Sequence, residues 1–311
     1  MGVPMSRAGL ILCSGIATQD FIFGVDQMPD RTTKYRARQF ACGGGGSAAN
    51  YAATVARLGG TVGLVSRLGE DAIGDGIVAE LVGDGVDCRF MKRFAGNRSS
   101  LSAIVVDPQG ERMIILYMDN ELPVAADWVP ELPPDTVAVL ADSRWPEGNL
   151  VMLQRARAMG IHAILDGDLP GVSVEAMRAA TLVAFSSEGL AASTHESSLE
   201  AGLRKAATMS DATMVVTQGG DGVSWLDGDQ FRHLPAYRVD AVDTLGAGDV
   251  FHGALALAVA EGQALEQALM FSSAAAAIKV SRFGGRLGAP DRAELLAFMD
   301  AHASDLLDGA V

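Results

Sequence analysis

The residues with the clearest chemical potential are the run DTLGAGD, residues 243–249, which stands directly before a long stretch of small apolar residues. Its glycines allow the N–H groups of Ala247, Gly248 and Asp249 to point toward one spot at the positive end of a helix dipole. This arrangement predicts an anion site. Asp249 is then either a helix cap or a base that takes a proton from an attacking hydroxyl. Because a helix dipole lowers the pKa of a carboxylate, we expect Asp249 to be ionised.

A second glycine-rich segment, GGGGSAANYAATVARLGG, covers residues 43–60. It predicts a glycine turn that opens a helix over residues 48–58. Either segment alone is more often an ordinary glycine-rich turn before a helix than a functional site. The chain contains no GxxxxGK[ST], no GxGxxG after its first strand and no HExxH, which argues against a P-loop kinase, a nicotinamide enzyme and a zinc protease. His252 follows Asp249 by one helical turn, and a lone histidine there is interpreted as a packed helix residue.

The elements that must position these motifs alternate along the chain. An apolar strand over 9–16 ends just before Asp20, and the carboxyl end of such a strand is where open α/β sheets bind ligands. Further elements are expected as short strands within 21–40, a strand over 61–66, a helix over 72–84, and a hairpin of 100–106 with 112–117. Later strands are expected over 136–141, 162–166, 182–185 and 213–217, with helices near 148–159, 174–180 and 190–209, then a hairpin of 222–226 with 230–234 and helices over 246–261, 264–282 and 291–303. Regular β-α-β alternation predicts a parallel sheet with helices on both faces.

Composition limits the possible partners and the compartment. The 311 residues are 49% hydrophobic and 20% charged, which is typical of a globular protein with a sizeable core. A formal net charge of −14 argues against nucleic acid and anionic membrane surfaces as partners. Cys13, Cys42 and Cys88 form neither a disulfide framework nor a CxxC site. No apolar run approaches the roughly 18 residues of a membrane span. We therefore expect a cytoplasmic protein.

The two motifs together resemble a known family. DTLGAGDVFHGAL closely resembles the C-terminal signature of PfkB, or ribokinase-like, sugar kinases, and Gly45, Gly46 and Asn50 match that family's Gly-Gly-x-x-x-Asn motif. The resemblance runs from Asp20 to residues 284–285. It implies one kinase domain over residues 1–311, a three-layer α/β/α fold with a mostly parallel central sheet, and a small β-sheet lid formed by about residues 21–41 and 100–118.

The resemblance also implies roles for individual residues. Asp249 would be the catalytic base, and the backbone of Gly246, Ala247 and Gly248 would be the anion hole. The residues expected to hold sugar hydroxyls are Asp20, Gly45, Gly46 and Asn50. Those expected at the nucleotide are Glu188, Thr217, Gly219, Gly222, Gly246 and Gly248.

Two cation sites are implied as well. Glu188 would organise Mg²⁺ through water, but Phe185 stands where the family has asparagine, so Ser186 or Ser187 with water would complete the network. A monovalent cation, K⁺, would be held by Asp243 and the carbonyls of Leu245, Lys279, Gly284 and Gly288.

The reaction implied is transfer of the γ-phosphate of ATP to a primary hydroxyl of a ketose, in a homodimer that associates through the lid. The strings LADSRW, LDGD, AFSSEGLA and RFGGRLGAPD resemble the sulfofructose kinases of this family, so 6-deoxy-6-sulfofructose is the favoured acceptor. Lys34 and Arg144 would grip its anionic end, unless they are ordinary surface charges.

Other functions stay open at this stage. A ribokinase or fructokinase that acts on a neutral sugar is the alternative, and a nucleoside acceptor is disfavoured because the pocket segments contain few aromatic residues. A sugar or nucleotide sensor without catalysis is a further alternative. ADP release with a panel of sugars would discriminate among them.

Overall fold

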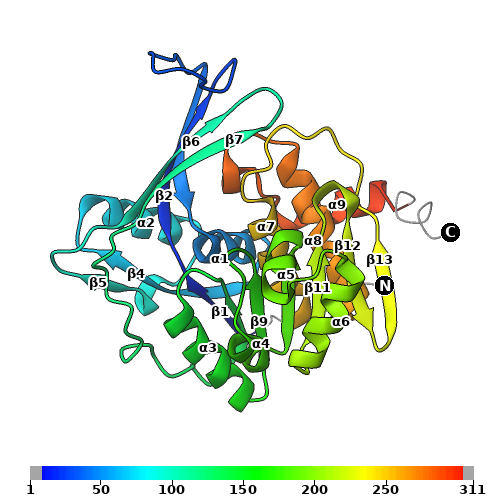
Figure 1. Ribbon diagram of the computed structural model, residues 1–311. Helices are drawn as coiled ribbons and strands as arrows, with labels where there is room; N and C mark the ends of the chain where they lie inside the picture. The colour runs from blue at the N-terminus through cyan, green and yellow to red at the C-terminus, as the bar shows by residue number, and fades with distance from the viewer. Residues whose placement is uncertain (1–8, 304–311) are drawn as a thin grey trace.

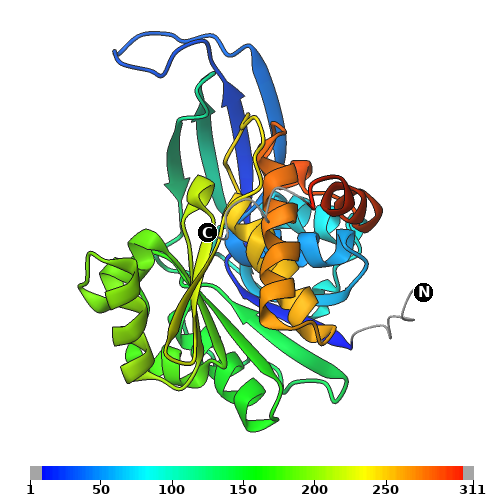
Figure 2. The same cartoon turned by 90° about the vertical axis from the view of Figure 1, so that its right-hand side faces the viewer.

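Two β-sheets of unequal size organise the chain in the computed structural model, which describes residues 9–303 (Figure 1). The large sheet has the strand order β13-β12-β11-β10-β9-β8-β1-β4-β5, and the small sheet has the order β3-β2-β6-β7. Helices cover both faces of the large sheet, and the small sheet projects away from it (Figures 1 and 2). These are the α/β/α layers that the alternating sequence pattern predicts.

The large sheet is parallel apart from one hairpin at its edge. Its parallel strands are β1 (Leu10–Gly15), β4 (Thr61–Gly69), β5 (Lys92–Phe94), β8 (Thr136–Ala141), β9 (His162–Gly167), β10 (Leu182–Ser186) and β11 (Thr213–Thr217). The antiparallel hairpin consists of β12 (Val223–Asp227) and β13 (Gln230–Leu234). Because the parallel strands share one direction, the segments that follow them gather at one edge of the sheet, where ligands bind in such folds.

Two groups of helices bury opposite faces of this sheet. One group is α1 (Ser47–Arg57), α2 (Ala72–Gly83), α7 (Ala247–Ala260), α8 (Leu265–Val280) and α9 (Arg292–Ala301); the other is α3 (Pro146–Ala158), α4 (Val174–Ala179), α5 (Ser187–Thr194) and α6 (Leu199–Met209). In β1, Ile11 and Cys13 face the first group, whereas Leu10 and Leu12 face the second. This alternation within a wholly apolar strand is typical of a sheet buried on both faces. Within residues 9–303 no helix is long and apolar enough to cross a membrane.

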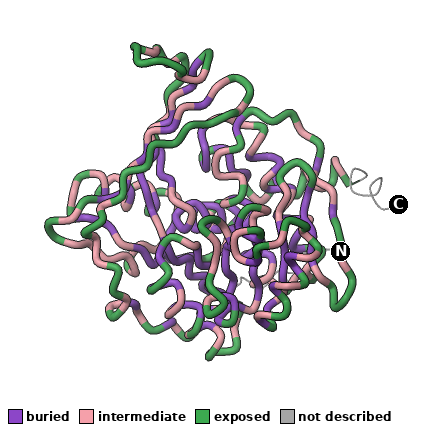
Figure 3. The backbone as a smooth tube through the Cα atoms, viewed as in Figure 1, coloured by how far each residue is buried: buried purple, intermediate pink, exposed green. Residues whose placement is uncertain are grey.

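The small sheet contains β2 (Thr18–Gly24), β3 (Gln39–Gly45), β6 (Ser100–Val106) and β7 (Arg112–Tyr117). One face rests on the body of the molecule, where Ile22 and Ile104 pack against Leu245 and Phe283. Strand β7 is an edge strand, and all 6 of its residues are exposed (Figure 3). The sheet is therefore anchored on one face and open along one edge.

The structure differs from the sequence prediction in two local features. The glycines at 43–45 end strand β3 instead of forming a turn, and only Gly46, with φ of 86°, makes the transition to α1. Strand β5 and the 3₁₀ turn η1 (Cys88–Phe90) were not predicted, because segments of 3 residues are too short to show a periodicity. Two more 3₁₀ turns, η2 (Gly219–Asp221) and η3 (Gly285–Gly288), lie beside the predicted site segments.

Candidate active site

Helix α7 begins at the glycine motif with N–H groups that lack partners. Gly246 precedes the helix in the left-handed conformation, with φ of 74°, and no side chain caps this end. The N–H of Ala247 donates to the carbonyl of Thr244 at 3.2 Å. Within residues 9–303 the N–H groups of Gly248 and Asp249 are left without an acceptor. The predicted anion site is therefore formed by two N–H groups rather than three.

Asp249 lies in the first turn of α7 and meets the beginning of α1. Its Oδ2 accepts a hydrogen bond of 2.6 Å from Nδ2 of Asn50, and the hydroxyl of Ser47 also donates to the carboxylate. A Cβ on Gly246 would lie 3.8 Å from both Asn50 Nδ2 and Asp249 Oδ2, so this glycine borders the pair. The buried Oδ1 of Asn50 has no partner among the described residues. An acceptor left free beside a carboxylate is suited to orient a ligand hydroxyl.

The carboxylate of Asp249 has a raised pKa. Burial raises it, and the hydrogen bond from Asn50 and the charge of His252 offset the shift only in part. The expectation that the helix dipole lowers this pKa is wrong, because the loss of water outweighs the dipole. A carboxylate with a raised pKa is a stronger base, which favours proton abstraction from a hydroxyl.

Asp20 lies close to this pair, on strand β2 of the small sheet. Its Oδ1 accepts hydrogen bonds from the hydroxyls of Thr18, at 2.8 Å, and Ser102. Burial raises the pKa of Asp20, and these two donors oppose the shift. A Cβ on Gly45 would lie 2.0 Å from Asp20 Oδ2, so the carboxylate fills the space that a side chain would take. The structure thus brings together Asp20 and Gly45, and the charge of Asp20 acts on Asp249.

A buried charged cluster that was not predicted lies beneath the start of α7. Nδ1 of His252 is 2.7 Å from the carbonyl of Gly248, and Nε2 is 3.1 Å from the carbonyl of Ala184 and 3.4 Å from Asp166 Oδ1. The two carbonyls and the Asp166 carboxylate can accept hydrogen bonds from both ring nitrogens, which favours the doubly protonated imidazolium. Burial lowers the pKa of His252, but Asp166 and the two carbonyls outweigh burial and raise it overall. The hydroxyl of Tyr51 donates to Asp166, and burial raises the pKa of Asp166 to about 6.

A pocket of about 560 Å³ opens beside the first turn of α7. Its walls include the predicted nucleotide residues Thr217, Gly219, Gly222 and Gly248. Apolar side chains of Phe251, Ala276, Ala277 and Val280 form another part of the wall. The size and the apolar lining are suited to a nucleotide base and sugar, with the unpaired N–H groups of α7 at one end.

Arg112, on strand β7, also lines this pocket and was missed by sequence reasoning. Its Nη1 donates to the hydroxyl of Thr244, so the small sheet touches the loop before α7. The motif search could not find it, because the contact depends on how the β6–β7 hairpin folds over the loop. Arg112 places a cation at a pocket whose predicted ligand is a polyphosphate.

The residues expected around Mg²⁺ take different places. Phe185 is fully buried in the core, so its side chain cannot stand in for asparagine. Ser186 caps α5 by accepting the N–H of Gly189 at 2.9 Å, and it donates to Asp168 Oδ1 at 2.9 Å. Glu188 is exposed in the first turn of the same helix.

Ser187, the other hydroxyl considered for Mg²⁺, donates to the carbonyl of Thr217 at 3.0 Å. No group of three or more histidine, cysteine or acidic side chains that could hold a metal ion occurs in the described part of the chain. Asp168, which follows β9, was not predicted as a site residue. The signal was present, because the string LDGD places two acids at the carboxyl end of a parallel strand.

The two cations predicted to grip an anionic acceptor lie on separate elements. Lys34 is exposed on the segment 25–38 that joins β2 to β3, at the free end of the small sheet (Figure 1). Arg144 follows β8, and its Nη2 lies 3.3 Å from Asp168 Oδ2. The rest of that segment points inward, since Asp142 accepts the N–H of Ile16 at 2.7 Å and Trp145 is buried. In this conformation the structure does not bring Lys34 and Arg144 together.

The predicted monovalent-cation residues gather near the loop before α7. The carboxylate of Asp243 accepts the N–H groups of Leu245, at 2.8 Å, and Gly284, at 2.9 Å. Lys279, expected to contribute its carbonyl, sends its side chain into the group, with Nζ 2.6 Å from the carbonyl oxygen of Asp243. Gly288 lies against the carbonyl of Lys279, because a Cβ on Gly288 would be 3.3 Å from that carbonyl oxygen.

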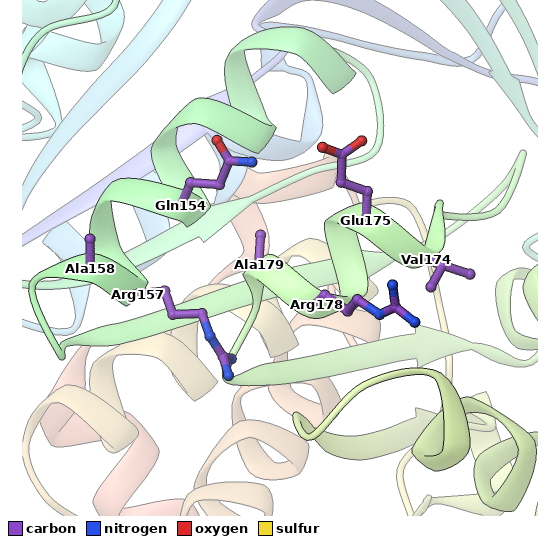
Figure 4. A pocket seen from close by; sticks show the side chains of 7 residues that line it. All are labelled: Gln154, Arg157, Ala158, Val174, Glu175, Arg178 and Ala179. Atoms are coloured by element: carbon purple, nitrogen blue, oxygen red, sulfur yellow. The ribbon is translucent and has the colours of Figure 1, made fainter.

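A second hollow, of about 540 Å³, lies between α3 and α4 (Figure 4). Its two arginines are already engaged: Arg157 pairs with Asp211 at 2.6 Å, and Arg178 donates to the carbonyl of Met209 at 3.0 Å. The polar groups around Asp249 lie on other elements. This hollow is therefore not a candidate catalytic centre.

Known proteins resemble this chain over most of its length. The family model described as pfkB family carbohydrate kinase matches residues 8–292. The ribokinase of Bacillus subtilis (strain 168) is 29% identical over 289 residues, covering 90% of this chain and 96% of the relative. The fructokinase of Vibrio alginolyticus is 27% identical over 284 residues, covering 82% of this chain and 91% of the relative.

Solved structures show the same fold. The crystal structure of a putative ribokinase from Agrobacterium tumefaciens is 36% identical, with a TM-score of 0.89 over 96% of this chain and 99% of that one. The Arabidopsis thaliana ribokinase complexed with ribose and ATP has a TM-score of 0.79 at 23% identity, over 94% and 99% of the two chains. The predicted α/β fold with a second, smaller sheet is confirmed by these likenesses.

Proposed function

Because the chain belongs to the pfkB family of carbohydrate kinases, which are phosphotransferases with an alcohol group as acceptor, we propose that it transfers the γ-phosphate of ATP to a primary hydroxyl of a ketose. The observation that carries this proposal is the hydrogen-bonded pair of Asp249 and Asn50 at the uncapped beginning of α7. A base, a free acceptor and two unpaired N–H groups meet there.

Different residues of this chain would bind the sugar, accept its proton and stabilise the transferring phosphoryl group. Asn50 Oδ1 and the carboxylate of Asp20 would hold the sugar so that one hydroxyl faces Asp249. Asp249 accepts the proton of that hydroxyl as its oxygen attacks the phosphorus. The N–H groups of Gly248 and Asp249 donate to the oxygens of the transferring group, whose charge spreads in the transition state. Positioning and neutralisation of charge supply most of the rate in such reactions.

ATP would occupy the 560 Å³ pocket, with its phosphates toward α7. The similar ribokinase of Arabidopsis thaliana supports this, since its structure was solved with ribose and ATP. Glu188 and Asp168 present carboxylate oxygens, the ligand type that Mg²⁺ prefers, and they would hold the ion through water. When bound, Mg²⁺ neutralises charge on the phosphates.

For the acceptor we favour 6-deoxy-6-sulfofructose. Arg144 supports this choice, because its guanidinium stands at the carboxyl edge of the sheet, where it pairs with Asp168. Lys34 is exposed on the small sheet, and it would reach the acceptor only if this sheet, the lid formed by about residues 21–41 and 100–118, closes over the sugar. A sulfonate would then receive a bidentate contact from arginine and a charge contact from lysine.

A neutral ribose or fructose is the second candidate. The relatives named ribokinase and fructokinase favour it, and so does the ion pair of Arg144 with Asp168, which already neutralises much of the arginine's charge. The two candidates differ in the charge of the acceptor, so only the sulfosugar proposal predicts that removing Arg144 affects the two kinds of sugar differently.

The test measures ADP release from ATP with 6-deoxy-6-sulfofructose, fructose and ribose, on the native chain, Arg144→Met and Arg204→Met. Arg204 is a matched control, since it forms a surface ion pair with Glu200 on α6. Arg144→Met should raise KM for the sulfosugar by about one to two orders of magnitude and hardly change KM for fructose. Equal effects on both sugars, or a native preference for ribose or fructose, would exclude the sulfosugar while leaving the kinase assignment intact.

We further propose that two copies associate through the small sheet. Strand β7 presents Met113, Ile114, Ile115, Leu116 and Tyr117 to solvent, with exposures from 37% to 63%. An exposed apolar strand at the edge of a sheet is a template for pairing with another chain. A second copy would cover this edge and place two small sheets against each other.

A further inference from the structure

A lysine side chain lies at full burial beside the loop that leads into α7. Lys279, on α8, has an exposed fraction of 0%. Its Nζ donates to the carbonyl oxygen of Asp243 at 2.6 Å and lies 3.3 Å from Oδ2 of the same residue. Lysine is almost never fully buried unless its charge is paired. The contact with Asp243 supplies that pairing.

Asp243 is the centre of a hydrogen-bonded group that fixes this loop. Its Oδ1 accepts the N–H of Leu245 at 2.8 Å, and its Oδ2 accepts the N–H groups of Gly284 and Gly285 at 2.9 and 3.0 Å. Three N–H donors and an ammonium group therefore surround this one carboxylate. The group connects the loop before α7 to the segment that follows α8.

The oxygens expected to hold K⁺ do not fit a free cation in this arrangement. The carbonyl of Asp243 already receives the Lys279 ammonium, and a second cation on that oxygen would lie beside a like charge in a buried place. The carbonyl of Lys279 accepts the N–H of Arg282 at 3.1 Å, and that of Gly284 accepts the N–H of Leu287 at 3.3 Å. Three members of the ligand set implied by the sequence resemblance, Asp243, Lys279 and Gly284, are therefore engaged by the protein's own groups.

We propose that the ammonium group of Lys279 is a built-in replacement for the monovalent cation, so that this kinase needs no K⁺. Lys279 is then a positioning residue: it acts through Asp243 on the loop that sets Gly246 and the unpaired N–H groups of α7. Burial lowers the pKa of Lys279, and the charge and hydrogen bond of Asp243 oppose that shift. The inference rests on the proposed kinase activity only where that activity serves as a readout.

The first test needs no variant and no acceptor sugar. The melting temperature of the native chain is measured in KCl, NaCl and choline chloride at equal ionic strength, with and without ATP. We expect the same value in all three salts. A rise of about 2–4 °C in KCl over choline chloride would show a bound K⁺ ion and overturn the proposal. This measurement does not require kinase activity. Failure of the inference can therefore be distinguished from failure of the proposed function.

The second test removes the ammonium group. Lys279→Met, compared with the surface control Lys205→Met, should lose ADP release by at least about tenfold in choline chloride and regain most of it in KCl or NH₄Cl. The native chain and the control should show the same rate in every salt. If Lys279 acts only in packing, K⁺ will not restore the activity of Lys279→Met, and this result would refute the inference. Activation of the native chain by K⁺ of fivefold or more (on the order of 1 kcal/mol) would refute it as well. Should Lys279→Met not fold, the native measurements decide.

Discussion

Asp249→Asn is the perturbation that tests the chemistry most directly. In the structure Asp249 Oδ2 accepts Nδ2 of Asn50 at 2.6 Å, and the hydroxyl of Ser47 donates to the same carboxylate. An asparagine at 249 keeps the shape and one amide oxygen for the donor from Asn50, while the serine hydroxyl can turn to accept. We therefore expect the fold and ATP binding to change little.

The magnitude follows from what the amide cannot do. It cannot take a proton from the attacking hydroxyl, and a positioned general base contributes about 10²–10⁴ in rate. At about 1.36 kcal/mol for each power of ten, this corresponds to roughly 2.7–5.4 kcal/mol of lost transition-state stabilisation. The loss should appear in kcat rather than in KM for ATP, because Asp249 acts on the hydroxyl. Since burial raises the pKa of Asp249, the acid limb of kcat should also lie above the pH at which a solvated aspartate titrates.

The assay couples ADP release to a reporter at saturating ATP and acceptor, and calorimetry measures ATP affinity separately. Glu266→Gln is the matched control, because Glu266 is an exposed acid in the first turn of the neighbouring helix α8. If Asp249 only caps a helix, both variants lose a few tenths of a kcal/mol of stability and keep their turnover. A kcat within threefold of native in Asp249→Asn, at about 0.6 kcal/mol, would refute its role as the base.

Two other features make predictions. The free energy of unfolding should fall as pH rises above about 6.5, because the pKa of His252 is raised in the folded state. The stabilisation from protonated His252 is complete below the pKa of the unfolded state and is lost as pH rises through the pKa of the folded state. Urea titrations from pH 6 to 9 should show this fall in the native chain and not in His252→Gln. If the free energy of unfolding changes with pH equally in both proteins, His252 is not a buried imidazolium. Ile115→Glu, at a side chain 63% exposed on β7, should convert a dimer into a monomer by light scattering, whereas Val82→Glu on α2, 57% exposed, should not. A native chain that is monomeric at all concentrations would exclude the dimer.

Much of the large sheet was predictable from local patterns, because most of its strands are apolar runs and the helices between them follow turn signals. The hairpin strands β6 and β7 and the strands β8 and β11 begin and end as expected. The glycine run at 43–45 was interpreted wrongly because its strand character depends on pairing with β2, and pairing partners are not visible in one segment.

The candidate site was predictable where a motif carries it and not where tertiary packing carries it. Asp249 and Asn50 stand in glycine motifs that a sequence search finds, and the structure joins them by a hydrogen bond. His252 was interpreted as a packed residue, and it is buried, but its charge pairing with Asp166 depends on the packing of helix α7 against strand β9, which a linear pattern does not show. The pKa of Asp249 was misjudged for the same reason, since burial is a property of the folded chain.

The glycines of β3 have a consequence for building chimeric kinases. A Cβ on Gly44 would lie 2.4 Å from Nη2 of Arg286, just as one on Gly45 would lie 2.0 Å from Asp20 Oδ2. Arg286 in turn pairs with Glu80 of α2 at 2.7 Å. The root of the small sheet is thus shaped by a residue near the far end of the chain. Exchanging residues 18–45 and 100–117 with those of a relative would replace the strands but not the arginine that packs against their glycines. We therefore expect a chimera to fold only when segment 285–288 and α2 are exchanged together with the strands.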